Sequence, residues 1–122
     1  MSTLILVTAP PSSIFAWHAL GLAQALKQKG APFSVFFYQD GVYVANALNW
    51  VQDDQRHLTH AWQALEIPLP VCVSAALQRG ITDLDNATRH QLNISNLATE
   101  FKLVGLGDLT DALGQAERVI QF

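Results

Sequence analysis

Apolar and polar positions along the 122-residue chain fall into alternating blocks that predict strands separated by helices. The expected strands are short apolar runs, a pattern typical of strands buried on both faces of a parallel sheet. They span residues 4–7, 33–38, 69–73, 101–104 and 118–122. Helical segments are expected at residues 12–29, 42–48, 52–65, 74–79 and 108–113, with a loop or loose helix at 82–91. This order predicts one domain over residues 1–122, a three-layer α/β/α fold with a mostly parallel sheet of about five strands.

The first helix has the clearest end signals. Ser12 or Ser13 can cap its start, because a serine hydroxyl accepts a hydrogen bond from a free first-turn amide. Lys27 and Lys29 complement the helix dipole in the last turn, and Gly30 is a natural stop. The inward-facing stripe is expected at helical spacing and consists of Phe15, Ala19, Leu22, Ala23 and Leu26.

Charge is scarce in this chain. Charged residues make up 14% of the sequence and hydrophobic residues 50%, whereas a usual charged share is about a quarter. This composition excludes disorder and leaves apolar surface for partner proteins. The net charge of −3 provides no basic stripe, so we expect no direct contact with nucleic acid.

The amino-terminal segment and the single cysteine bear on the compartment. The start of the chain lacks a basic region, and Pro10-Pro11 interrupts its apolar run. We therefore expect neither a signal peptide nor a membrane span. One cysteine can form no internal disulfide, and a free thiol suits a reducing compartment. These features predict a cytoplasmic protein.

Several residue patterns have an ordinary structural explanation. Gly105-Leu106-Gly107 lacks the third glycine of a dinucleotide-binding loop, so we interpret it as a tight turn entering a helix. His57 and His60 could share a helix face, but local spacing supplies no carboxylate or thiol to complete a metal site. We expect both histidines on a polar outer face. The tryptophans are expected in the core or at an interface: Trp17, Trp50 and Trp62.

Cys72 is the candidate nucleophile, and its pattern supports two interpretations. Its neighbours Val71 and Val73 are typical of a cysteine buried as a small hydrophobic residue. However, Cys72 also ends a predicted strand, and a helix is expected from Ser74. A helix N-terminus stabilises a thiolate through its dipole and its free amides. The residues alone leave both a structural and a reactive cysteine open.

Two segments form a recognisable signature. These are FFYQDGVY at residues 36–43, followed by Ala45-Asn46, and PVCVSAALQRG at residues 70–80. Further matching positions are Asn96-Leu97, Phe101, residues 105–107 and residues 117–122. Taken in order over essentially the whole chain, these segments resemble the DsrE-like sulfurtransferases.

The resemblance implies a cytoplasmic sulfur-relay subunit of a TusBCD/DsrEFH-type complex. Such a subunit assembles with TusB-like and TusC-like subunits into a heterohexamer, a dimer of heterotrimers. Cys72 would accept sulfane sulfur as a persulfide from a TusA-like donor and pass it to a TusE-like acceptor, for 2-thiouridine formation at the tRNA wobble position. The exchange at sulfur needs no metal and no cofactor, and the subunit contacts neither nucleic acid nor a membrane. Arg79, if it lies close to Cys72, would stabilise the anionic sulfur.

Two other functions are compatible with these residues, and a third is disfavoured. A DsrE-like subunit in sulfur oxidation would use the same carrier chemistry. A non-catalytic structural subunit of the same hexamer would hold Cys72 buried and unreactive. A flavodoxin-like ligand-binding domain is disfavoured, because residues 8–13 lack a glycine-rich phosphate-binding loop.

Two departures from the family pattern could alter the docking of a donor or acceptor. Residues 10–13 stand where relatives more often have a loop with glycine and tyrosine, and Gln78 stands where a second basic residue is common.

Overall fold

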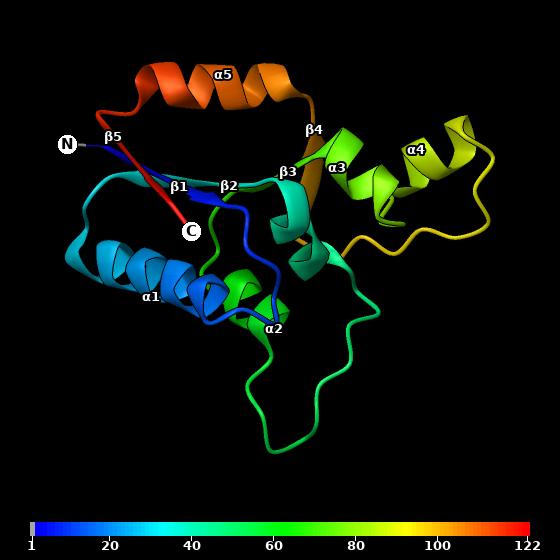
Figure 1. Cartoon of the computed structure of the whole chain (residues 1–122), viewed down its shortest axis with the longest axis horizontal. Helices are drawn as coiled ribbons and strands as arrows, with labels where there is room; N and C mark the ends of the chain where they lie inside the picture. Colours follow the sequence, from blue (N-terminus) through cyan, green and yellow to red (C-terminus); the bar gives the residue numbers. More distant parts are fainter. Residues whose placement is uncertain (1) are drawn as a thin grey trace.

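The computed structural model describes residues 2–122 and contains one five-stranded sheet (Figure 1). Its strands are β1 (Thr3–Val7), β2 (Phe33–Phe37), β3 (Leu69–Cys72), β4 (Phe101–Val104) and β5 (Arg118–Gln121). The spatial order is β4-β3-β2-β1-β5, and every neighbouring pair is parallel. The predicted α/β/α fold with a parallel sheet is confirmed.

Helices cover both faces of the sheet. Helices α1 (Ile14–Lys29) and α2 (Leu58–Gln63) lie on one face, and α5 (Leu106–Gln115) lies on the other (Figure 1). The chain advances from β1 to β4 in one direction across the sheet and then returns to the opposite edge for β5. Because crossovers between parallel strands are right-handed, this reversal places α5 on the opposite face from α1 and α2.

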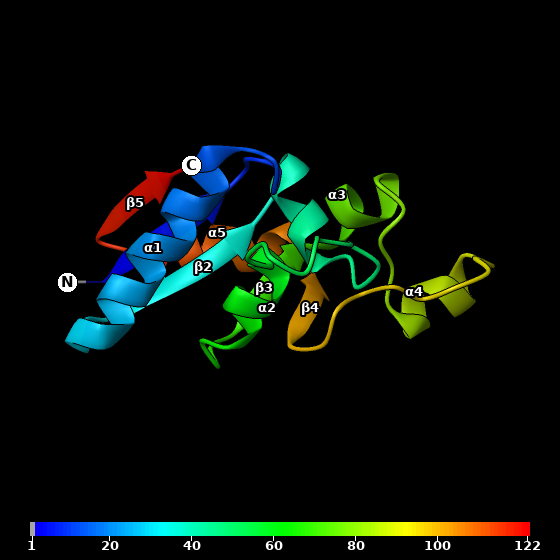
Figure 2. The same cartoon turned by 90° about the horizontal axis from the view of Figure 1, so that it is seen from below.

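Three short helical elements lie beyond the carboxyl ends of the strands. These are the 3-10 helix η1 (Gln39–Ala45), α3 (Val73–Gln78) and α4 (Leu84–Arg89). Figure 2 shows α4 and the segment after it projecting away from the sheet. Backbone hydrogen bonds connect the segment after η1 with the segment before β4. The Ala47 amide donates to the Asn96 carbonyl at 2.7 Å, and the Ala98 amide donates to the Ala45 carbonyl at 2.7 Å.

Helix α1 has the predicted ends, and its predicted inward stripe is buried or packs against the core except at Phe15. The Ser13 hydroxyl accepts a hydrogen bond from the Phe15 amide at 3.1 Å, and Gly30 ends the helix with φ of 70°. The buried residues are Ala16, Ala19, Leu20 and Ala23. The prediction of Phe15 in this stripe is wrong, because its side chain is 57% exposed. Small alanine side chains let the helix pack close to the sheet, and the wide phenyl ring stays outside.

The remaining helices differ from the predictions mainly at their starts. The helix expected at 42–48 is the 3-10 helix η1, and the helix expected from residue 52 begins at residue 58. Residues 52–56 are exposed, whereas Leu58 and Trp62 reach the core. Most helix stability in proteins comes from packing an apolar face, so the polar residues before Leu58 stay outside the helix. Helix α4 forms within the segment 82–91, where the Asp83 carboxylate caps it by accepting from the Asn86 amide.

Aromatic residues fill the core between α2 and the sheet. Trp62 is fully buried, and its ring meets that of Phe37 edge to face, with centroids 5.2 Å apart. Trp17 is half-buried with the Arg56 guanidinium 4.9 Å from its ring centroid, while Trp50 is 79% exposed. Of the helices in residues 2–122, none combines the length and apolar content of a membrane crossing.

Candidate functional site

Cys72 lies at the junction of β3 and α3, at the carboxyl edge of the parallel sheet. It is the last residue of β3 and the N-cap of α3, with φ of −60° and ψ of 119°. Its side chain is only 1% exposed, but it lines a pocket of about 170 Å³. The pocket is lined by Tyr38, Gln39, Cys72, Ser74, Ala75, Gln78, Arg79 and Leu106. Cys72 is therefore buried, as the structural interpretation expects, and it also borders a cavity, so its reactivity stays a prediction.

The start of η1 forms one wall of this pocket. The Tyr38 amide donates to the Val7 carbonyl oxygen at 2.9 Å, and the Gly41 amide donates to the Tyr38 carbonyl at 2.9 Å. Gln39, between them, has φ of 50°. These contacts attach η1 to the end of β1, and the segment after β2 reaches the Cys72 pocket through Tyr38 and Gln39.

Arg79 faces the same pocket from the end of α3. Its Nε donates to Asp40 Oδ1 at 2.9 Å, and its Nη1 donates to the Ala75 carbonyl at 3.0 Å. Gly80 follows with φ of 77° and lets the chain turn away from the helix. The structure thus brings Arg79 to the pocket of Cys72, as its proposed role requires. The partner of Arg79, Asp40, was not singled out from the sequence.

Asn96, a position of the family signature, connects the segments that surround the Cys72 pocket. It is 6% exposed, and its Oδ1 accepts from the Thr82 amide at 2.9 Å. Its Nδ2 donates to the Gly80 carbonyl at 3.0 Å and to Asn46 Oδ1 at 3.1 Å. One buried amide therefore joins the turn after α3 to the end of η1. No local sequence pattern signals such a role.

The histidine pair and the glycine turn have structural explanations. His57 and His60 stack with ring centroids 3.9 Å apart, and His57 Nε2 lies 3.1 Å from the Asn49 carbonyl oxygen. The expectation of two outward-facing histidines is wrong for His57, which is half-buried as the N-cap of α2. Between residues 2 and 122, no three His, Cys, Asp or Glu side chains form a group that could hold a metal. Gly105 begins α5 as its N-cap, as the turn interpretation predicted.

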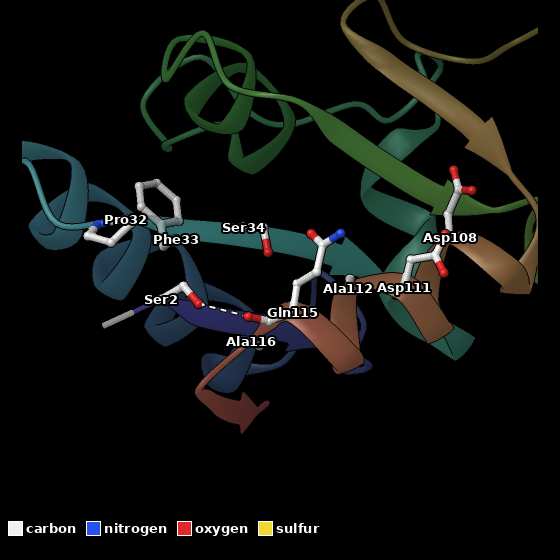
Figure 3. Close-up of a pocket in the computed structure, with 9 residues that line it drawn as sticks. All are labelled: Ser2, Pro32, Phe33, Ser34, Asp108, Asp111, Ala112, Gln115 and Ala116. Atoms are coloured by element: carbon white, nitrogen blue, oxygen red, sulfur yellow. Dashed lines mark hydrogen bonds between the residues drawn. The ribbon is translucent and has the colours of Figure 1, made fainter.

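A larger cavity of about 510 Å³ lies between α5 and β2 (Figure 3). Asp108, Asp111 and Gln115 line it from α5, and Ser2 Oγ donates to the Gln115 carbonyl at 3.2 Å across one end. Phe33 and Ser34, at the amino end of β2, line the other side. Open α/β sheets place their sites at the carboxyl ends of strands, and this cavity has no cysteine. The pocket of Cys72 is therefore the candidate functional site.

Comparison with known proteins identifies the family. The model of the DsrE/DsrF-like family matches residues 1–122. The chain belongs to this family. Similar relatives include "Sulfurtransferase TusD homolog" of Vibrio parahaemolyticus, 43% identical over 98% of this chain and 95% of the relative. "Sulfurtransferase TusD" of Pectobacterium carotovorum is 43% identical over 100% of this chain and 99% of the relative. The protein of the same name from Proteus mirabilis is 44% identical over 97% of this chain and 95% of the relative.

Two solved structures share the fold of this chain. The crystal structure of the YchN protein from E. coli matches with a TM-score of 0.77 over 100% of both chains, at 19% identity. A protein of unknown function from Bacteroides thetaiotaomicron, BT1422, matches with a TM-score of 0.61 at 17% identity, over 99% of this chain and 94% of that protein. At these identities the likeness concerns the fold alone. The family model and the relatives confirm the resemblance that the signature segments indicated.

Proposed function

We propose that this sulfurtransferase carries sulfane sulfur as a persulfide on Cys72. It receives the sulfur from a TusA-like donor and passes it to a TusE-like acceptor. The activity class is supported by full-length relatives named sulfurtransferase TusD. The observation that carries the residue assignment is the position of Cys72, the single cysteine of the chain, beside a pocket at the carboxyl edge of the sheet.

The transfer consists of two exchanges at sulfur. The Cys72 thiolate attacks the outer sulfur of the donor's persulfide, and the donor's S–S bond breaks. Its electron pair leaves with the inner sulfur, so the donor departs as a thiolate and Cys72 becomes a persulfide. The acceptor's thiolate then attacks the outer sulfur of this persulfide in the same way and releases Cys72. Each step forms one S–S bond and breaks another, so no external oxidant or reductant is consumed.

Two features of the chain suit this chemistry. No side chain caps the start of α3, and the first amides of a helix have no acceptor within it. These amides directly follow Cys72 in the chain, on the side of the pocket where the sulfur exchange is proposed. A second nearby cysteine would discharge the persulfide as an internal disulfide, and the sequence contains only one cysteine.

We extend the proposal to the setting in which the protein works. The relatives are named TusD, which supports a cytoplasmic relay with TusB-like and TusC-like subunits in a dimer of heterotrimers. The relay would serve 2-thiouridine formation at the tRNA wobble position. Exposed apolar side chains provide surface for sister subunits, and they include Ile14, Phe15, Leu48, Trp50 and Leu84. The net charge of −3 suits a subunit that hands sulfur to a protein and does not bind tRNA.

One observation favours a second function. Cys72 is 1% exposed, which is the burial expected of a non-catalytic structural subunit. In that case the thiol would serve only as a core side chain, and sulfur would be carried by another subunit. The two functions differ in whether Cys72 gains sulfur.

Sulfur loading distinguishes them directly. The protein, alone and assembled with TusB-like and TusC-like subunits, is incubated with a persulfidated TusA-like donor, and its intact mass is measured. We expect one added sulfur atom on the wild type and none on Cys72→Ser, which replaces only the nucleophile. The variant should still assemble with its partners. Sulfur on the Cys72→Ser protein, or no sulfur on the assembled wild type, would contradict the proposal.

A further inference from the structure

We propose that Asp40 is a positioning residue for sulfur transfer, because it orients the Arg79 guanidinium toward the anionic sulfur of Cys72. Asp40 can have this role only if Cys72 carries sulfur as proposed above. Asp40 and Arg79 are 39 positions apart in the sequence and come from η1 and the end of α3. The ion pair between them joins the two elements that border the pocket.

Arg79 is the charged residue of this pocket. Of the eight described residues that line it, Arg79 is the only one whose side chain carries a full charge at neutral pH. Exchange at sulfur moves the negative charge from the Cys72 sulfur to the donor's inner sulfur. A guanidinium beside these atoms stabilises the charge through charge-assisted hydrogen bonds. Arg79 therefore suits the chemistry that the pocket has to perform.

The contacts of Arg79 hold its side chain at two points and leave donors free. Nε donates to Asp40 at 2.9 Å, and Nη1 donates to the Ala75 carbonyl at 3.0 Å. A guanidinium has five N–H groups in a rigid plane, so two fixed bonds determine the direction of the others. The Arg79 side chain is 23% exposed, which leaves it partly shielded from water. Held in this way, it presents its remaining N–H groups with little loss of side-chain freedom during the reaction.

Asp40 lies in a segment whose backbone is attached to the end of β1. It directly precedes Gly41, whose close contact with the Val7 backbone attaches η1 to β1. The Asp40 side chain is 54% exposed, and ion pairs with such an exposed partner contribute little to folding stability. A contribution to folding stability therefore explains the Arg79–Asp40 ion pair only weakly. Orientation of the Arg79 guanidinium explains it better, because a group that acts in a reaction works best when a second residue fixes its geometry.

The test compares sulfur loading with the alkylation of Cys72 by two reagents of different charge. Loading is the reaction of the Cys72 thiolate with R–S–SH to give the Cys72 persulfide and R–S⁻, measured as a rate with a persulfidated TusA-like donor. Alkylation uses anionic iodoacetate and neutral iodoacetamide, and the ratio of the two rates reports the positive charge that faces the sulfur. This ratio does not depend on the presence of a sulfur donor.

Arg79→Gln should slow loading about tenfold and lower the iodoacetate-to-iodoacetamide ratio, since both need the cation. Asp40→Ala should change both quantities in the same direction and add little in the Arg79→Gln background, because residues that act through one another are non-additive. Asp40→Asn keeps an acceptor oxygen and should restore most of the loading rate. The matched control is Asp53→Ala, which removes an exposed carboxylate away from the pocket and should leave both quantities unchanged.

Three results would overturn the proposal. Faster loading by Asp40→Ala would mean that this carboxylate only repels the anionic sulfur. Additive effects of the Asp40 and Arg79 variants would mean that they act separately. An alkylation ratio unchanged in Arg79→Gln would mean that Arg79 does not face Cys72. If wild-type protein gains no sulfur, the proposed function fails, whereas the alkylation ratio still decides the orientation of Arg79. Matched thermal unfolding of all variants shows that the fold is retained.

Discussion

Gly41 lies so close to Val7 that a β-carbon on Gly41 would be 2.1 Å from the Val7 carbonyl oxygen. The same carbonyl oxygen accepts a hydrogen bond from the Tyr38 amide. Only glycine leaves room for this approach, since the neighbouring atoms belong to the backbone of Val7 and Thr8 and cannot rotate away. This close approach packs η1 against the end of β1 and so helps to position Asp40 and Gln39 beside the Cys72 pocket.

Gly41→Ala should therefore lower the free energy of unfolding by about 1–3 kcal/mol, the usual cost of forcing an extra methyl group into a packed site. Urea denaturation measures the change. Gly21→Ala is the matched control, because Gly21 lies within α1 and an added β-carbon there meets nothing within 4 Å. That variant should gain about 0.5–1 kcal/mol. Equal stabilities of the two variants would contradict the close contact of Gly41.

Trp62→Ala should reduce the free energy of unfolding by about 3–5 kcal/mol, as truncation of a buried aromatic side chain generally does. Trp62 is fully buried and loses its edge contact with Phe37 in this variant. Trp50→Ala makes the same chemical change at a side chain that is 79% exposed, so its effect should stay within about 0.5 kcal/mol. Chemical denaturation of both proteins checks this, and a comparable loss in the two would count against the described core.

Cys72 should react with small alkylating reagents in the native protein and exclude large ones. The thiol is 1% exposed, but its pocket of about 170 Å³ admits a molecule the size of iodoacetamide. A maleimide coupled to polyethylene glycol should react only after denaturation, and intact mass distinguishes the two adducts. Denatured protein serves as the reference for complete labelling. If iodoacetamide also needs denaturation, Cys72 is a core residue and the structural-subunit function gains support.

Strand positions could be predicted because their signals are local. The run at residues 101–104 coincides with β4, and the run at 69–73 differs from β3 by one residue. Continuous apolar segments between turn residues indicate buried strands without knowledge of their neighbours. The buried face of α1 was less predictable. Phe15 and Ala16 are adjacent in the helix, and Ala16 is buried while Phe15 is exposed. Which of the two side chains faces the sheet depends on how closely the helix approaches it.

The sequence by itself determined the strand and helix order, the single thiol at the end of β3, and membership of the family through segments spread over the whole chain. Those properties lie in local runs and residue identities. Only the tertiary structure decided that Cys72 is buried beside a small pocket, and that Arg79 reaches this pocket with Asp40 as its partner. The reason is physical: burial and ion pairing depend on which loops meet. The loops after β2 and β3 meet because these strands are parallel neighbours in the sheet.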